Sequence, residues 1–181
     1  MQRKRWRKMN LKEKIRNIQD FPKPGIGFKD ITTVLQDGEA WQYCINEFIR
    51  QLEDVEYDII VGPEARGFLM GAPMAYATGK GFVPVRKPGK LPAETLKYEY
   101  ELEYGTDTLE IHKDAIKPGQ KVVIMDDLLA TGGTVEAVVK MIESLGGEVV
   151  ALCFMIELEF LKARDKFEGY KIVSLVSYDE E

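Results

Sequence analysis

Five short apolar runs alternate with helical patterns along this chain, and this alternation constrains the fold more than any other feature. None of the runs alternates strictly between apolar and polar residues, as a strand with one wet face would. Strands that are buried on both faces and separated by helices form parallel sheets. The order therefore predicts an α/β fold with a parallel sheet of about five strands, flanked by helices. The runs are YDIIV (57–61), GFVPV (81–85), KVVIM (121–125), EVVALCFM (148–155) and KIVSLV (171–176).

Two segments between these runs have the period of an amphipathic helix. In VEAVVKMIESL (135–145) the apolar residues recur every three or four positions and share one stripe. The segment GFLMGAPMAYA (67–77) contains several small residues, which permit close packing of a helix against a sheet. Both segments directly follow a predicted strand, as βα units require.

One stretch departs from this pattern. LKYEYELEY (96–104) alternates perfectly between apolar and charged residues, GTD (105–107) can turn the chain, and TLEIH (108–112) alternates again. Period-two runs on either side of a turn predict an antiparallel hairpin. We expect Leu109 and Ile111 to point inward and the polar face of the hairpin to lie in water. The preceding KPGKLPAE contains two prolines and a glycine, which favour a loop able to move.

Length and charge limit the possible functions. A chain of 181 residues fits a single domain, and its net charge of −5 does not suit a broad nucleic-acid-binding face. Five cations lie in MQRKRWRK, but no apolar signal core follows them, so we expect residues 1–10 to be a basic, disordered extension. No run is long enough to span a membrane, and the cytoplasm is the expected location.

The reactive side chains are few. Cys44 and Cys153 lie far apart in apolar surroundings without a CxxC pattern, which favours buried free thiols over a disulfide or a metal site. His112 is the only histidine, which excludes a histidine-rich metal centre.

The most informative segment is VVIMDDLLATGGT (122–134), where a buried strand ends in two acids. Ligands of parallel sheets bind beyond the carboxyl ends of the strands. The following Ala130, Thr131, Gly132, Gly133 and Thr134 offer hydroxyls and open N–H groups ahead of a helix, which suits a monophosphate. Asp126 and Asp127 can accept hydrogen bonds from sugar hydroxyls or face hydrated Mg²⁺. Alone, two acids at a strand end more often belong to a solvated loop, whereas their combination with the Thr/Gly loop and the following helix predicts a sugar-phosphate site.

Two cationic segments follow other strands. Arg66, in GPEARGF, can clamp a second phosphate group, although pairing with Glu64 on the surface explains it as well. Arg86, Lys87 and Lys90 suggest a polyanion, although a solvated loop would look similar. Other phosphate-binding classes fit poorly because GxxxxGK[ST] and GxGxxG are both missing from the sequence.

These segments resemble one family. VVIMDDLLATGGT is similar to the signature of the type I phosphoribosyltransferases, which use 5-phosphoribosyl 1-pyrophosphate. DFPKPGIGFKDIT, GPEARGFLMGAP, VPVRKPGKLP, LEYGTDTLEIHKDAIKPG and LGGEVV match in order and spacing the members that act on adenine. The resemblance begins near Ile18 and reaches the C-terminus. It implies transfer of the phosphoribosyl group to adenine, giving AMP and pyrophosphate in purine salvage, with a small hood beside the sheet.

The resemblance also implies roles for individual residues. Ribose 5-phosphate would contact Asp126, Asp127 and residues Ala130 to Thr134. Pyrophosphate would contact Arg66, Lys87, Lys90 and Tyr104, with Mg²⁺ held by substrate and water rather than directly by the protein. Adenine would stack between Phe28 and Leu128, while backbone groups of Gly27 and Lys29 read its edge.

Catalysis is assigned by resemblance to Glu103 and Arg66. By pattern alone Glu103 is one of several acids on a solvated strand face. In the implied reaction it exchanges a proton with the purine, and a homodimer is the expected assembly. Gly27 and Lys29 depart from the family, which has a branched aliphatic residue and an arginine there. A transferase for another purine, such as xanthine, and a non-catalytic sensor of the sugar pyrophosphate remain alternatives.

Overall fold

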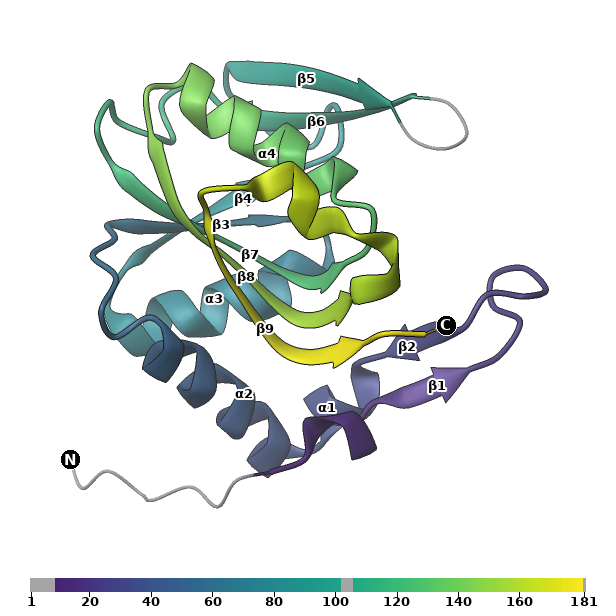
Figure 1. Ribbon diagram of the computed structural model, residues 1–181. Helices are drawn as coiled ribbons and strands as arrows, with labels where there is room; N and C mark the ends of the chain where they lie inside the picture. The colour runs from purple at the N-terminus through teal and green to yellow at the C-terminus, as the bar shows by residue number, and fades with distance from the viewer. Residues whose placement is uncertain (1–8, 102–105, 181) are drawn as a thin grey trace.

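The structure is a computed structural model that describes residues 9–101 and 106–180 (Figure 1). Its centre is a five-stranded sheet of β3 (Ile59–Pro63), β4 (Gly81–Val85), β7 (Lys121–Leu129), β8 (Glu148–Leu158) and β9 (Lys171–Tyr178). The spatial order is β4-β3-β7-β8-β9, and all neighbouring strands are parallel. The predicted parallel sheet is therefore confirmed.

The strand order reverses direction at β3. The chain leaves β3 for the edge strand β4 and later returns as β7 on the other side of β3. Loops that follow β3 and β7 consequently depart toward opposite faces of the sheet and leave a crevice between them. This crevice lies where the sequence predicts a ligand.

Helices cover both faces of the sheet. Figure 1 shows α2 (Gly38–Gln51) and α3 (Arg66–Thr78) along one face, and α4 (Gly133–Ser144) with the hairpin over the other. The core is accordingly divided into two clusters, one on each side of the central strands. Both predicted amphipathic segments are helices.

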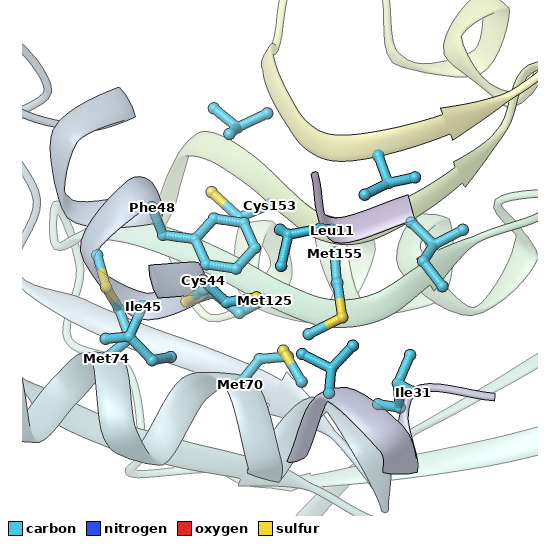
Figure 2. Close-up of a cluster of buried hydrophobic side chains, with 14 of the residues drawn as sticks. Leu11, Ile31, Cys44, Ile45, Phe48, Met70, Met74, Met125, Cys153 and Met155 are labelled. Atoms are coloured by element: carbon cyan, nitrogen blue, oxygen red, sulfur yellow. The ribbon is translucent and has the colours of Figure 1, made fainter. Parts of the chain in front are cut away.

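The core on the α2–α3 side is rich in sulfur (Figure 2). Met70 and Met74 of α3 lie near Met125 of β7, with Cys44 and Cys153 in the same cluster. Both cysteines are free and buried, as predicted. Burial raises the pKa of each thiol to about 12, so both stay protonated and unreactive at neutral pH.

Glycines in α3 bring this helix very close to the sheet. A Cβ atom on Gly67 would lie 2.8 Å from Pro63 Cδ and 2.9 Å from the carbonyl oxygen of Met125. A side chain at this position would push the helix away from β3 and β7. The close packing holds Arg66, the first residue of α3, beside the end of β7.

The predicted hairpin consists of β5 (Thr95–Glu101) and β6 (Thr106–His112). Leu109 and Ile111 are buried as expected. The expectation that the whole polar face lies in water was wrong for Glu110, which is only 2% exposed. The loop after β4 covers it, because Arg86 and Glu110 exchange backbone hydrogen bonds of 2.9 and 2.7 Å. Lys97 Nζ lies 2.9 Å from Glu110 Oε1 and balances the buried charge.

A small antiparallel unit stands beside the sheet and forms the expected hood (Figure 1). It comprises β1 (Arg16–Ile18) and β2 (Phe28–Asp30), preceded by the 3₁₀ turn η1 (Leu11–Glu13) and followed by α1 (Thr32–Gln36). The Arg16 guanidinium, together with hydrogen bonds from Thr32, lowers the pKa of Asp30 to about 2. This ion pair ties the two strands together.

Residues at the start of the described chain contact the fold. Met9 packs against the core, and Asn10 Nδ2 donates a 2.7 Å hydrogen bond to Glu13 Oε1. Both residues belong to the segment expected to be a disordered extension, whose first eight residues lie outside the described part. Within the described ranges, no helix is long and apolar enough to cross a membrane.

Candidate active site

A hollow of about 190 Å³ lies in the crevice beyond β3 and β7. Its lining comes from three parts of the chain: a cation after β3, two acids near the end of β7, and the loop before α4. The lining consists of Arg66, Asp126, Asp127, Leu128, Ala130, Thr131, Gly132, Gly133, Thr134 and Val135. All of the residues predicted to contact ribose 5-phosphate are thus brought together.

The two acids lie at the floor of this hollow, Asp127 buried and Asp126 partly buried. Asp127 is only 3% exposed, and its backbone N–H donates a 2.9 Å hydrogen bond to Asp126 Oδ1. Burial, followed by the neighbouring Asp127 charge, raises the pKa of Asp126 well above its ordinary value. Burial also raises the pKa of Asp127, although the Arg66 charge opposes this shift. Such carboxylates are stabilised by a ligand that brings hydroxyl donors or a positive charge.

Arg66 reaches across the crevice rather than pairing with its neighbour. Its Nε lies 3.0 Å from Asp127 Oδ2. The alternative explanation, a surface pair with Glu64, does not describe the structure, because Glu64 pairs with Arg86 and Lys90. The Arg66 side chain stays 40% exposed, so its outer N–H groups remain accessible to an anion.

The loop before α4 has the conformation of an anion-binding turn. Gly132 caps the helix with φ of 82°, a left-handed backbone that favours glycine. A Cβ there would lie 2.9 Å from Phe167 Cε2 of the 3₁₀ segment η3 (Ala163–Phe167). The first N–H groups of a helix lack partners within it and attract anions. This geometry is compatible with the predicted phosphate site, which stays a prediction.

The ion pair that anchors η3 was not foreseen. Arg164 donates two hydrogen bonds of 2.6 Å to the buried Glu157 at the end of β8. Glu157 also accepts a 2.6 Å hydrogen bond from Ser174 of β9. This network holds Phe167 behind the phosphate loop. Its residues belong to no periodic pattern, so the sequence carries no signal for it.

Glu64 organises the second cationic segment. It accepts hydrogen bonds of 2.9 Å from both Arg86 Nε and the Lys87 backbone N–H, and Lys90 Nζ lies 3.2 Å away. Burial alone would raise the pKa of Glu64, but these donors together lower it below its ordinary value. Lys87 and Lys90 do not line the 190 Å³ hollow. Glu64, two residues before Arg66 in the chain, nevertheless fixes the position of the loop that carries them.

Lys87 extends from this loop to the hairpin, where its Nζ pairs with Asp107 Oδ2. The same oxygen accepts a 3.1 Å hydrogen bond from the Tyr100 hydroxyl. Tyr100 also lies 3.3 Å from Thr134 Oγ1 in the phosphate loop. The sequence pattern places Asp107 in a turn and Tyr100 on the apolar side of a strand, so neither contact was predicted.

The predicted base-binding residues lie partly at this site. Alternation along β2 sends Phe28 and Lys29 to opposite sides. The Phe28 ring lies 5.6 Å from the Arg66 guanidinium carbon and packs edge-on against Phe21. The Lys29 side chain points away, toward Asn17 and the Tyr178 ring. Only the backbone of Lys29 can therefore face the crevice.

The remaining predicted base contacts are less defined. Leu128 lines the hollow, and Gly27 is half-buried at the start of the hood strand. Glu103 and Tyr104, which the resemblance assigned to catalysis and pyrophosphate binding, lie outside the described residues.

The donor set fits Mg²⁺ only if the ion is shared with a substrate. Among the described residues, no three His, Cys, Asp or Glu side chains are close enough to hold a metal. Mg²⁺ keeps several waters and is commonly bound through one or two carboxylates plus substrate phosphates. Asp126 and Asp127 line the hollow where they would face the waters of a substrate-held ion.

The amino-acid sequence matches known proteins over nearly its whole length. Residues 32–177 match the family model described as the phosphoribosyl transferase domain. The adenine phosphoribosyltransferase of Alkaliphilus oremlandii is 68% identical over 171 residues, which cover 94% of this chain and 99% of that protein. The corresponding protein of Clostridium tetani is 64% identical with the same coverage.

Solved structures agree with the sequence matches. The adenine phosphoribosyltransferase of Thermoanaerobacter pseudethanolicus superposes with a TM-score of 0.90 at 62% identity, covering 93% of this chain and 98% of that one. The Saccharomyces cerevisiae enzyme, solved with adenine and an imino-altritol bisphosphate, gives 0.87 at 43% identity, covering 91% and 96%. With its five-stranded parallel sheet, its hairpin and the paired acids near the end of β7, the chain belongs to the phosphoribosyltransferase family, among the adenine phosphoribosyltransferases.

Proposed function

We propose that the protein transfers the 5-phosphoribosyl group from 5-phosphoribosyl 1-pyrophosphate to adenine, giving AMP and pyrophosphate in purine salvage. The observation that carries this proposal is the single hollow where Arg66, the buried Asp126–Asp127 pair and the loop before α4 meet. 5-Phosphoribosyl 1-pyrophosphate satisfies all three. It brings a 5-phosphate for the loop, ribose hydroxyls for the acids and a pyrophosphate for the arginine.

The ribose 5-phosphate part would occupy the hollow itself. Its phosphate would accept hydrogen bonds from residues Ala130 to Thr134, where the dipole of α4 favours negative charge. The ribose hydroxyls would donate to Asp126 and Asp127, whose buried charges gain most from such donors. These contacts fix the anomeric carbon on the Arg66 side of the hollow.

Pyrophosphate would lie between Arg66 and the loop that carries Lys87 and Lys90. The exposed side of the Arg66 guanidinium and the 51% exposed Lys90 support this placement. Tyr104 is proposed as a further contact from the hairpin. Mg²⁺, when bound to the substrate oxygens near Asp126 and Asp127, supplies charge neutralisation for the leaving pyrophosphate.

Adenine would stack between Phe28 and Leu128. The position of Phe28 beside Arg66 supports this assignment, since the base must reach the anomeric carbon from that side. Backbone groups of Gly27 and Lys29 would read the base edge. Adenine presents a donor at C6 and an acceptor at N1, whereas hypoxanthine and guanine reverse both. A site matched to one pattern rejects the other strongly, because buried polar groups would be left unpaired.

The reaction forms a bond from adenine N9 to the anomeric carbon and breaks the bond from that carbon to pyrophosphate. The ribose gains positive charge during the exchange, and the carboxylates of Asp126 and Asp127, which line the same hollow, would stabilise it. Arg66 and Lys87 stabilise the departing anion. Glu103 is the proposed acid–base group that exchanges a proton with N7 of the purine. A positioned acid–base group of this kind typically raises the reaction rate by roughly 10²–10⁴-fold.

We also propose a cytoplasmic homodimer. The outward face of α3 carries the exposed apolar side chains Leu69 and Tyr76, which are 43% and 92% accessible. Because α3 begins at Arg66, a partner on this face would abut the site. Size-exclusion chromatography with light scattering tests the assembly, and Tyr76→Asp is expected to shift it toward monomer.

The test of function offers adenine, hypoxanthine, guanine and xanthine separately with 5-phosphoribosyl 1-pyrophosphate and Mg²⁺, and measures nucleotide and pyrophosphate. AMP from adenine alone supports the proposal. Product from another base would keep the sugar-phosphate site but overturn the roles of Phe28, Gly27 and Lys29. Binding of the sugar pyrophosphate without product from any base would favour a non-catalytic sensor.

A further inference from the structure

Lys87 has an anionic partner within the protein. Its Nζ pairs with Asp107 Oδ2, which comes from the start of β6 rather than from the pyrophosphate loop. The Asp107 carboxylate is itself held from two further directions. Its Oδ1 accepts a 2.9 Å hydrogen bond from the Thr108 N–H, and its Oδ2 accepts one of 3.1 Å from the Tyr100 hydroxyl.

This arrangement keeps Asp107 charged and in place. Burial alone would raise its pKa, but Lys87 and the backbone donor lower it below the ordinary value. The carboxylate is therefore an anion at neutral pH. Both partners are partly accessible, with side chains 40% and 26% exposed, so an incoming polyanion can reach the ammonium group. Lys90 and Arg86 have a similar internal partner in Glu64.

We propose that Asp107 is a positioning residue that competes with pyrophosphate for Lys87. In the absence of ligand the carboxylate takes the place of a phosphate oxygen, and Lys87 exchanges partners when pyrophosphate arrives. The inference rests on the proposed function, because it assigns Lys87 to the pyrophosphate site. Its consequence is weaker pyrophosphate binding, which helps the product to leave after transfer.

The expected size of the effect follows from the exposure of the pair. Partly exposed ion pairs contribute about 0.2–1 kcal/mol. Removing the competing charge should therefore tighten pyrophosphate binding by about 1.4- to fivefold. Asp107→Asn is the suitable change, because an amide oxygen can still accept from Thr108 N–H while the negative charge is lost.

The experiment measures binding of inorganic pyrophosphate with Mg²⁺ by titration calorimetry to the full-length protein, the Asp107→Asn variant and a matched control. Glu94→Gln is the control, since Glu94 pairs with Lys113 at the base of the same hairpin and the substitution changes the net charge equally. We expect tighter binding in Asp107→Asn and wild-type affinity in Glu94→Gln. In steady-state assays, pyrophosphate should also inhibit Asp107→Asn more strongly as a product.

A double-mutant cycle separates competition from a general charge effect. In a Lys87→Ala background, Asp107→Asn should no longer change pyrophosphate affinity. A gain that persists without Lys87 would overturn the competition. Weaker binding in the single variant would mean that Asp107 preorganises Lys87, and unchanged binding would mean that the pair has no role; either result contradicts the inference. If the wild-type protein does not bind pyrophosphate at all, the result contradicts the proposed function itself and not only the competition at Lys87.

Discussion

Arg66 Nε lies 3.0 Å from Asp127 Oδ2 and thereby joins the end of β3 to the end of β7. The contact crosses the point where the strand order reverses, which is where α/β sheets bind ligands. Arg66 stabilises a buried acid on one side and presents free N–H groups on the other.

Arg66→Gln should lower kcat/KM for the sugar pyrophosphate by roughly 10²-fold, since it removes a donor aimed at developing negative charge. Arg66→Lys should recover only part of the loss, because an ammonium lacks the planar fork of arginine. Steady-state kinetics at saturating adenine measure both. Nearly unchanged kinetics in Arg66→Gln would contradict pyrophosphate binding at this residue.

Asp126→Asn should stabilise the unliganded protein while abolishing substrate binding. Burial and the neighbouring Asp127 raise the pKa of Asp126 above 3.8, so the unfolded chain releases this proton more readily. Folding stability is therefore lost as pH rises through the raised pKa. Asparagine cannot ionise and its Oδ1 can still accept from the Asp127 N–H. We expect a gain of about 0.5–2 kcal/mol at pH 7.

Urea unfolding at pH 4 and pH 7 measures this effect. The difference between Asp126→Asn and wild type should be larger at pH 7 than at pH 4. A variant that is less stable than wild type at pH 7 would show that the carboxylate is not strained in the unliganded site.

Gly132→Ala should damage the phosphate site. Its φ of 82° disfavours a side chain, at a cost of about 1–2 kcal/mol, and the added Cβ would press on Phe167. We expect KM for the sugar pyrophosphate to rise at least about tenfold, since small displacements of binding groups are costly. Gly79→Ala is the control, with φ of 68° and open space around it. Equal KM values for the two variants would mean that the Gly132 turn does not position the phosphate.

Glu103→Gln should reduce turnover by roughly 10²–10⁴-fold and leave the affinity for the sugar pyrophosphate nearly unchanged. Single-turnover kinetics and calorimetric titration separate the two quantities. Equal losses in turnover and affinity would count against an acid–base role for Glu103.

The sequence predicts the repeating parts of the fold well. The run 81–85 coincides with β4 (Gly81–Val85), and the stripe 135–145 corresponds to α4, because periodicity reflects which face of an element is buried. The strands β7 and β8 extend further than predicted, since polar residues near their ends, such as Asp126 and Glu157, are still paired in the sheet. The three-residue strands of the hood are too short to show a period.

The site was predicted where it depends on local sequence and missed where it depends on distant contacts. Residues 126–134 form one continuous segment, so their grouping is visible in the chain itself. Partner choice is different: Arg66 bonds to Asp127 rather than to Glu64, and Lys87 to Asp107. These pairings are set by the strand order and by how the hairpin lies on the loop after β4, and no local pattern encodes either.

The most direct test of the account is a crystal structure of the protein with AMP bound. The account predicts the phosphate on the N–H groups of residues Ala130 to Thr134, the ribose hydroxyls on Asp126 and Asp127, and the adenine ring between Phe28 and Leu128. A phosphate bound elsewhere, or a base that does not contact Phe28, would contradict the proposed site.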